Sequence, residues 1–179
     1  MPLPIAHGLV GASIIAVMSS RDPVRVHWHA LAVGAGLAIC PDFDVFFSAV
    51  LGLGNRWHGS FSHSITFAIL VGLLVPWLLG ISPITSRFVA ATASHGFLDA
   101  LTGKELHDGE ELLWPFSTHR FRLGLFDYFH LGPTNEESAL QTAKAFLSIS
   151  LFEAAIFVPM FILAIRVCKT SSRFETRPH

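Results

Sequence analysis

Long apolar runs alternate with short polar stretches along this chain. Four of the runs cover residues 4–18, 29–53, 64–81 and 84–101, and the fifth and clearest covers residues 145–168. A helix that crosses a bilayer needs roughly 20 mostly apolar residues, with about 17 to 25 tolerated. The pattern therefore predicts an all-α, polytopic membrane helix bundle with about five membrane-embedded helices, of which the first is short.

Two interruptions organise the predicted bundle. Pro41-Asp42-Phe43-Asp44 lies inside the second run and favours a broken helix there, because proline removes a backbone donor. Residues 102–144 are too charged to cross a membrane, so we expect them to lie on its surface or to fold over a site. We interpret the chain as one membrane domain, with four helices in residues 1–101, the polar segment 102–144, a last helix at 145–168 and a tail at 169–179.

Composition supports the membrane interpretation. Hydrophobic residues make up 51% of the 179 and charged residues only 14%, whereas a soluble domain usually carries about 25% charged residues. The mean hydropathy is +0.53. A net charge of −1 makes nucleic acid a poor candidate partner. Cys40 and Cys168 both lie in apolar runs and form no CxxC pair, so we interpret them as packing residues.

The basic residues give a weak signal for orientation. If five helices cross, one side of the membrane receives seven Lys and Arg residues, namely Arg21, Arg25, Arg87, Arg166, Lys169, Arg173 and Arg177. The other side receives five, namely Arg56, Lys104, Arg120, Arg122 and Lys144. We predict an integral protein of a bacterial or archaeal cytoplasmic (inner) membrane, with its N-terminus outside and its C-terminus in the cytoplasm.

Several ionisable residues stand inside or beside the apolar runs. Such groups cost roughly 2.5 to 3.5 kcal/mol each on insertion scales, so they usually face a partner or a cavity. Asp42 and Asp44 repel each other unless a cation or a proton neutralises them. The alternative is that they cap a new helix that starts at Phe43.

Histidines supply the remaining candidate ligands. His95 and Asp99 are four residues apart, which places both side chains on one helical face where they could reach one ion. The alternative is a histidine–aspartate hydrogen bond that only tethers helices. His58 and His63 precede the third helix, and His7 is a solitary polar residue in the first. With the predicted topology these residues and the two aspartates meet at the outer membrane face.

A mixed histidine and aspartate set suits Zn²⁺, Mn²⁺ or Fe²⁺ better than Ca²⁺ or Mg²⁺. The predicted ligands are seven, which is enough for one or two ions: His7, Asp42, Asp44, His58, His63, His95 and Asp99. If such an ion activates a water molecule for hydrolysis, Asp42 and Asp44 are also the candidate catalytic residues. Asp44 then either binds a second ion or takes a proton from that water.

Other polar and aromatic residues carry weaker signals. Trp114 belongs to an interfacial aromatic anchor, and Arg120 and Arg122 are placed to bind a phosphate or a lipid head group, although ordinary snorkelling is as good an account. The histidines not assigned as ligands lie at the opposite face, in the polar segment or in the tail: His27, His29, His107, His119, His130 and His179.

The order of these motifs resembles the YdjM-type, LexA-regulated, membrane-bound metal-dependent hydrolases. The matching pieces span roughly residues 5 to 125: Ala6-His7-Gly8, Pro41-Asp42-Phe43-Asp44, His58-Gly59-Ser60-Phe61-Ser62-His63-Ser64, His95-Gly96-Phe97-Leu98-Asp99-Ala100-Leu101-Thr102 and Leu113-Trp114-Pro115-Phe116. In the third piece Gly59 replaces the family's arginine, Ser60 its glycine and Ser62 its threonine.

The resemblance implies a function. The family is distantly similar to zinc-dependent phospholipases C, so the expected chemistry is phosphoester hydrolysis, with a membrane lipid as the substrate and metal ions that activate water. A non-catalytic membrane protein with a structural metal site is the alternative, and a metal carrier is a third. The sequence leaves the oligomeric state open.

Overall fold

Helices make up almost all of the regular structure in the computed structural model, which describes residues 2–19, 28–52, 57–81, 86–102, 109–125 and 138–175. Its elements are α1 (Pro4–Met18), α2 (Trp28–Ile39), η1 (Cys40–Phe43), α3 (Asp44–Leu51), η3 (Phe61–His63), α4 (Ile65–Leu78), α5 (Ser86–Thr102) and α6 (Ala139–Glu175). Within these ranges β-structure is limited to an isolated bridge between Glu110 and Phe121. The all-α prediction is confirmed for the described residues.

The second predicted helix is broken at the proline, as the sequence indicated. α2 ends at Ile39, the short 3₁₀ helix η1 carries Pro41 and Asp42, and α3 begins at Asp44. Neither η1 nor α3 has a side-chain hydrogen bond at its N-cap residue. The two aspartates therefore do not act as helix caps, and their carboxylates serve other partners.

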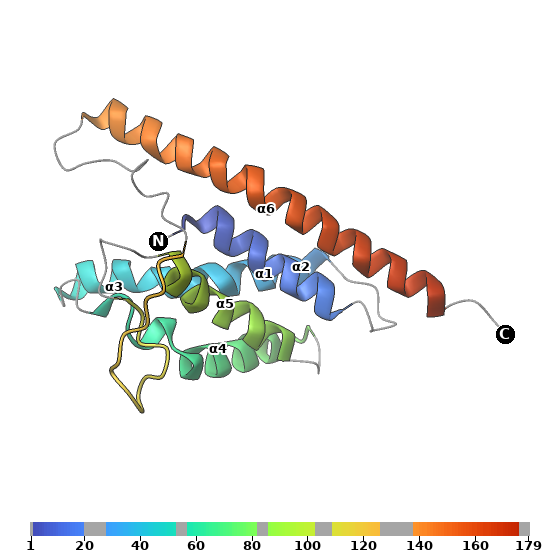
Figure 1. The fold of residues 1–179 in the computed structure, drawn as a ribbon. Coiled ribbons are helices and arrows are strands. Elements are labelled where there is room, and N and C mark those ends of the chain that lie inside the picture. Colours follow the sequence, from blue (N-terminus) through green and yellow to red (C-terminus); the bar gives the residue numbers. More distant parts are fainter. Residues whose placement is uncertain are drawn as a thin grey trace.

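The first four long helices alternate in direction. α1 packs against α2, α5 and α6, and α5 also packs against α4. Figure 1 shows that the start of α1, the end of α2, the start of α4 and the end of α5 lie at the same end of the bundle. Polar residues that are far apart in the sequence are brought together there.

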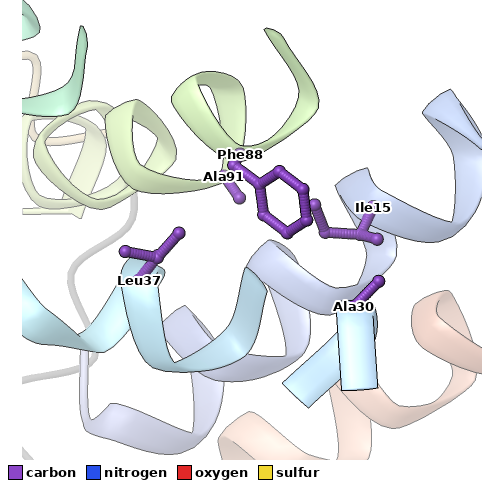
Figure 2. Packing of buried hydrophobic residues seen from close by; sticks show 5 residues of the cluster. All are labelled: Ile15, Ala30, Leu37, Phe88 and Ala91. Atoms are coloured by element: carbon purple, nitrogen blue, oxygen red, sulfur yellow. The ribbon is translucent and has the colours of Figure 1, made fainter. Parts of the chain in front are cut away.

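The helices pack through small residues around a compact apolar cluster. A Cβ atom added to Gly11 of α1 would lie 2.5 Å from the carbonyl oxygen of Gly34 in α2, so only glycine allows these backbones to touch. Small residues have this role in membrane helix pairs, where close packing replaces the hydrophobic effect. The buried cluster joins α1, α2 and α5 (Figure 2) and contains Ile15, Ala30, Leu37, Phe88 and Ala91.

Large apolar side chains cover the outside of the bundle. Leu151 and Leu163 of α6 are 63% and 62% exposed, and Trp77 of α4 is 71% exposed. α3 adds Phe46, which is 62% exposed. Large exposed apolar side chains gathered on one molecule mark contacts with a protein or a membrane, so the surface suits contact with lipid.

The prediction of five spanning helices is not met by helix length. Within the described residues, two helical stretches are long and apolar enough to cross a membrane: Trp28–Phe46, which runs from α2 through η1 into α3 and has 19 residues, and Ala139–Cys168 of α6, which has 30. α1 and α4 are apolar, but their 15 and 14 residues give a rise of only about 21 to 23 Å, against a hydrocarbon core of about 30 Å. For α4 the apolar pattern also counted residues 79–81, which follow the helix, whereas α1 has the bounds that the pattern indicated and is simply short.

α6 extends beyond its predicted bounds and is anchored by a buried acid. It begins at Ala139 and ends at Glu175, whereas the apolar pattern indicated residues 145–168. The Glu153 side chain is fully buried, and its carboxylate accepts hydrogen bonds from the backbone N–H groups of Leu3 at 2.6 Å and Ala6 at 3.3 Å. The N-terminus of α1 has no side-chain cap of its own, so a carboxylate from α6 meets the positive end of the α1 dipole.

The basic residues used for orientation are only partly described. Arg87 is buried, and its Nη1 atom donates a hydrogen bond of 2.6 Å to Ser19 Oγ, so this charge belongs to helix packing rather than to a loop. Five of the others lie outside the described residues, namely Arg21, Arg25, Arg56, Lys104 and Arg177, as do the side chains of Lys169 and Arg173. The predicted orientation stays a prediction.

Candidate metal centre

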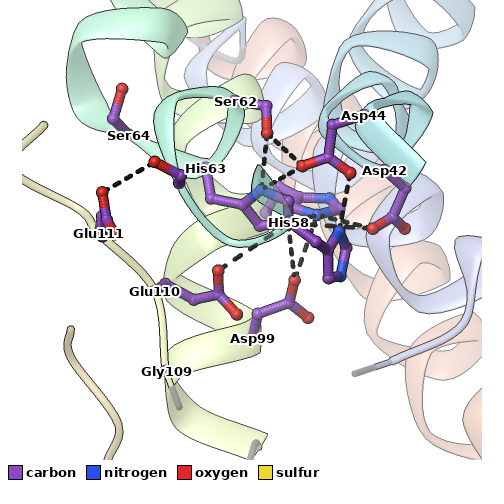
Figure 3. Close-up of polar contacts among 12 residues, drawn as sticks. Asp42, Asp44, His58, Ser62, His63, Ser64, Asp99, Gly109, Glu110 and Glu111 are labelled. Atoms are coloured by element: carbon purple, nitrogen blue, oxygen red, sulfur yellow. Dashed lines mark hydrogen bonds and ion pairs between the residues drawn. The ribbon is translucent and has the colours of Figure 1, made fainter. Parts of the chain in front are cut away.

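The structure brings all seven predicted ligands to one end of the bundle. They come from α1, η1, α3, the turn before η3, η3 itself and α5, and are His7, Asp42, Asp44, His58, His63, His95 and Asp99. Most are deeply buried, with exposed fractions of 0% for His95, 2% for Asp99 and 3% for His63. Figure 3 shows how His63 lies in the middle of the acids, with Asp42 and Asp44 on one side and Asp99 on the other.

Four of these residues have the spacing of ligands that share one cation. His63 Nε2 lies 3.1 Å from His95 Nε2, 3.4 Å from Asp99 Oδ2 and 3.9 Å from Asp42 Oδ1. Nitrogen and oxygen ligands bind zinc at about 2.0 to 2.2 Å, so two ligands of one ion can be no more than about 4.4 Å apart. All three separations satisfy this limit.

His63 and His95 each use Nδ1 in a hydrogen bond, and these bonds direct their Nε2 atoms toward the candidate ligand set. His95 Nδ1 lies 2.7 Å from the carbonyl oxygen of Ala38, which can only accept, so Nδ1 carries the proton. Ser62 Oγ donates to Asp44 Oδ2 at 2.6 Å and therefore accepts from His63 Nδ1 at 2.9 Å. Both Nε2 atoms are left with lone pairs that face each other and two carboxylates. Metal-binding histidines have this arrangement, with the second nitrogen donating to a fixed partner.

Unsatisfied polar atoms in the same place point to a missing positive charge. Asp42 Oδ1 and both carboxylate oxygens of Asp99 are buried without a hydrogen-bond partner. Both ring nitrogens of His7 are in the same state. A buried polar atom without a partner is unfavourable, and a cation between Asp42 and Asp99 would satisfy oxygens of both carboxylates.

Asp44, His58 and His63 form a second group that could hold an ion, but here hydrogen bonds already satisfy the acid. Asp44 Oδ1 accepts from His58 Nδ1 at 2.7 Å, and Asp44 Oδ2 accepts from Ser62 Oγ. Burial lowers the pKa of His58, but the hydrogen bond to Asp44 and the charges of the neighbouring acids together outweigh it and leave that pKa above its ordinary value. This group orients His63 toward the first set.

His7 extends the first set from α1. Its ring stacks on His95 with centroids 3.9 Å apart and an interplanar angle of 22°. Its Nε2 atom lies 3.4 Å from Asp99 Oδ1, the oxygen that does not face His63 and His95. Asp99 therefore presents Oδ1 to His7 and Oδ2 to His63 and His95.

Three residues near the centre were not identified from the sequence. Glu110 is 3% exposed, lies 4.0 Å from His63 Nε2 and has an elevated pKa because it is buried. Ser62 links Asp44 to His63, and Glu153 fixes the start of the helix that carries His7. Ser62 stands in a motif that resembles the family's, whereas Glu110 and Glu153 have no spacing that distinguishes them from ordinary acids.

The predicted substrate-binding residues lie in segment 109–125, beside the cluster. Arg120 Nη2 is 3.1 Å from Glu111 Oε1, and Arg120 Nη1 donates to the carbonyl oxygen of Gly109 at 3.0 Å. The ring of Trp114 packs against that of Phe61, with ring centroids 6.0 Å apart. Arg122 is exposed. Arg120 thus supports the backbone next to Glu110, and a role for the three residues in substrate binding stays a prediction.

The histidines not assigned as ligands lie away from the cluster where they are described. His29 stacks beside Trp28 at the start of α2, and His119 is exposed and packs against Phe121. His27, His107, His130 and His179 lie outside the described residues.

Comparison with known proteins identifies the family. A family model described as YdjM inner membrane protein matches residues 1–172. Inner membrane protein YbcI of Escherichia coli strain K12 is 33% identical over 132 residues, which cover 68% of this chain and 72% of YbcI. No solved structure matches the chain significantly. The match over almost the whole length confirms the resemblance seen in the motifs, and the chain is a member of the YdjM inner membrane protein family.

Proposed function

We propose that this protein is a membrane-embedded, metal-dependent hydrolase that cleaves a phosphoester of a lipid at the membrane interface. The observation that carries the proposal is the convergence of His63, His95, Asp42 and Asp99, whose ligand atoms share one small space and lack other partners for their charges. Mixed nitrogen and oxygen ligands favour Zn²⁺, with Mn²⁺ or Fe²⁺ as the next candidates.

In this proposal some residues of the cluster bind the ion and others orient the residues that bind it. His63, His95, Asp42 and Asp99 hold the ion, while Ser62 and the carbonyl oxygen of Ala38 keep the two Nε2 atoms directed at it. A divalent ion here would supply Lewis acidity, which polarises a phosphoryl or acyl oxygen and makes water a stronger nucleophile at neutral pH. Asp44 holds His58 and Ser62 through its two oxygens and positions His63.

The open side of the centre favours a lipid substrate. The Asp42 side chain is 23% exposed, whereas those of His63, His95 and Asp99 are 0% exposed, so access is beside Asp42. The neighbouring Phe43 and Phe46 are 60% and 62% exposed. A substrate that approaches past these rings has apolar chains next to its polar ester, as a phospholipid does.

The membrane arrangement that fits this proposal has all five predicted helices embedded. α1, α4 and α5 are short, but they alternate in direction with α2 (Figure 1), and apart from Ser86 at the start of α5 their exposed side chains are apolar. Short spans are accommodated by local thinning of the bilayer. The proposed orientation keeps the N-terminus and the centre at the outer face of the membrane and the C-terminus in the cytoplasm.

Turnover of lipid phosphoesters by purified protein tests the proposal. We would load the protein with Zn²⁺, Mn²⁺ or Fe²⁺ in detergent, offer phospholipids in mixed micelles, and separate the products by mass spectrometry. Wild type should release a phosphorylated head group or phosphate, a chelator should abolish release, and Asp99→Asn should reduce it by at least about 100-fold because one ligand is lost.

A structural metal site is the competing function, and the same preparation separates the two. Asp99 and His95 of α5 are buried, and Asp99 lies close to His7 of α1 and His63 of η3, so an ion that only ties these elements together would also explain the cluster. If metal-loaded wild type bound its ion at full occupancy but cleaved neither lipid nor soluble phosphoesters, the hydrolase proposal would fail in favour of the structural site. Cleavage of soluble phosphoesters alone would remove the lipid from the proposal.

A further inference from the structure

We infer that Glu110, from the polar segment that follows α5, is an additional ligand of the same cation. This inference rests on the metal centre of the proposed function and names a residue that the motifs do not include. The Glu110 carboxylate is 3% exposed, and its Oε2 atom is buried without a hydrogen-bond partner. Oε2 lies 4.0 Å from His63 Nε2, within the limit of about 4.4 Å for two ligands of one zinc ion.

The backbone around Glu110 is fixed from both sides. Its N–H donates to the carbonyl oxygen of Phe121 at 3.0 Å, and the Phe121 N–H donates back at 2.8 Å. The N–H of Glu111 donates to the carbonyl oxygen of Gly59 at 2.8 Å. Segment 109–125 is therefore attached to the turn that carries His58, and the carboxylate of Glu110 is held next to the cluster, as Figure 3 shows.

Gly59 leaves the space that this carboxylate occupies. Its φ angle is +76°, a left-handed conformation that side chains other than glycine adopt rarely. A Cβ atom at position 59 would lie 2.6 Å from Glu110 Oε2 and 3.2 Å from the carbonyl oxygen of Gly109. Even alanine at this position would push the carboxylate away from its place.

The adjacent acid shows what an ordinary carboxylate in this segment does. Glu111 Oε2 accepts a hydrogen bond of 2.8 Å from Ser60 Oγ, and Glu111 Oε1 pairs with Arg120. Both of its oxygens have partners, whereas the inner oxygen of Glu110 has none. Since a buried carboxylate is unfavourable without a partner, a cation shared with His63 is the partner that the geometry supplies. The ion would then hold the polar segment to the helices.

Glutamine substitutions at the two positions test the inference with matched shape. We would measure Zn²⁺ affinity by chelator competition for wild type, Glu110→Gln and Glu111→Gln, and record the visible absorption of the Co²⁺-loaded proteins. Glu110→Gln should weaken Zn²⁺ binding at least about tenfold and shift the Co²⁺ bands, because a neutral amide replaces the negatively charged carboxylate. Glu111→Gln should leave the Co²⁺ bands unchanged and alter affinity less than threefold.

A second variant tests the same carboxylate without changing it. Gly59→Ala should weaken Zn²⁺ binding and shift the Co²⁺ bands as Glu110→Gln does, because its Cβ atom would displace the Glu110 carboxylate. Unchanged affinity and an unchanged Co²⁺ spectrum in Glu110→Gln would overturn the inference while leaving the proposed hydrolase intact. Absence of metal binding in wild type would overturn both.

Discussion

Ser62 and Ser64 are separated by one residue, yet their hydroxyl groups serve different structures. Ser62 Oγ donates to Asp44 and accepts from His63, so it determines which nitrogen of His63 faces the candidate ligand set. Ser64 is the N-cap of α4, and its Oγ accepts from the Phe67 N–H at 3.1 Å. At the scale of single residues, hydrogen bonds around the candidate ligands set how those ligands are oriented.

Removing the Ser62 hydroxyl should therefore weaken metal binding more than folding. In Ser62→Ala, His63 Nδ1 loses its acceptor, the ring becomes free to change tautomer, and we expect metal affinity to fall by about 10- to 100-fold. Ser62→Thr keeps a hydroxyl and should retain affinity close to that of wild type. Isothermal titration of the purified, metal-free proteins measures both values.

Ser64→Ala is the control for this prediction. It removes an N-cap, so the free energy of unfolding should fall by about 1 kcal/mol, while metal affinity stays close to that of wild type. Equal losses of affinity in Ser62→Ala and Ser64→Ala would mean that both act through folding, and the orienting role of Ser62 would be wrong.

The ligand candidates were visible in the sequence because each stood in a context that made it unusual. His95 and Asp99 are four residues apart on an apolar helix, and the structure places both at the cluster. Glu110 lies among other charged residues of a polar segment and reaches the cluster only through long-range backbone bonds to Gly59 and Phe121. No local pattern encodes such contacts, so sequence could not distinguish Glu110 from Glu111.

At the scale of elements, the chain's helices were easier to predict than their ends. Proline removes a backbone donor, and at position 41 it stands beside two aspartates inside an apolar run, so the break between α2 and α3 followed from the sequence. Pro76 and Pro159 lie inside α4 and α6 without ending them, so proline alone does not predict a break. The ends of α6 did not, because its first turns at Ala139 are polar and an apolar pattern cannot reveal them. The contact between Glu153 and the start of α1 depends on how α6 packs and was likewise hidden.

Glu153 should be the main polar anchor of α6. Glu153→Ala leaves the N–H groups of Leu3 and Ala6 without their acceptor, and we expect the free energy of unfolding to fall by about 2 kcal/mol, the range for hydrogen bonds to a charged group. Glu153→Gln keeps one carbonyl oxygen and should lose less. Thermal or denaturant unfolding in detergent measures the change.

An exposed position of the same helix provides the comparison. Leu163 is 62% exposed on α6, and Leu163→Ala removes only a side chain that faces lipid or detergent, so its unfolding should match that of wild type within about 0.5 kcal/mol. Equal effects of the Glu153 and Leu163 substitutions would contradict the anchoring role of Glu153.

At the scale of the whole molecule, the alternating directions of the helices determine both where the candidate metal centre forms and how the chain can cross the membrane. The clustered side chains lie near the start of α1, just after α2, just before α4 and near the end of α5, which requires these helices to run in alternating directions (Figure 1). Two helices pass the length test for a span, and the remaining ones are apolar but short. The number of crossings determines whether the two ends of the chain share a side.

Reporter fusions at the two ends of the chain distinguish an odd number of membrane crossings, such as five, from an even number, such as two. Five crossings place the ends on opposite sides of the membrane. With the C-terminus in the cytoplasm, a green fluorescent protein fused there should fluoresce and an alkaline phosphatase fused there should be inactive. A tag at the N-terminus should be accessible to protease from outside. If both ends were found on one side, an even number of crossings would be established and the five-helix arrangement would be wrong.

The central claim is that the buried histidine and aspartate cluster binds a metal ion, and elemental analysis of the detergent-purified protein tests it most directly. Wild type should hold close to stoichiometric Zn, Mn or Fe, as isolated or after reconstitution. The double variant His95→Ala/Asp99→Ala should lose the metal, and His119→Ala, at an exposed histidine away from the cluster, should retain it. A wild-type protein that is folded but takes up none of these metals would contradict the account and would assign the buried acids and histidines to a shared proton instead.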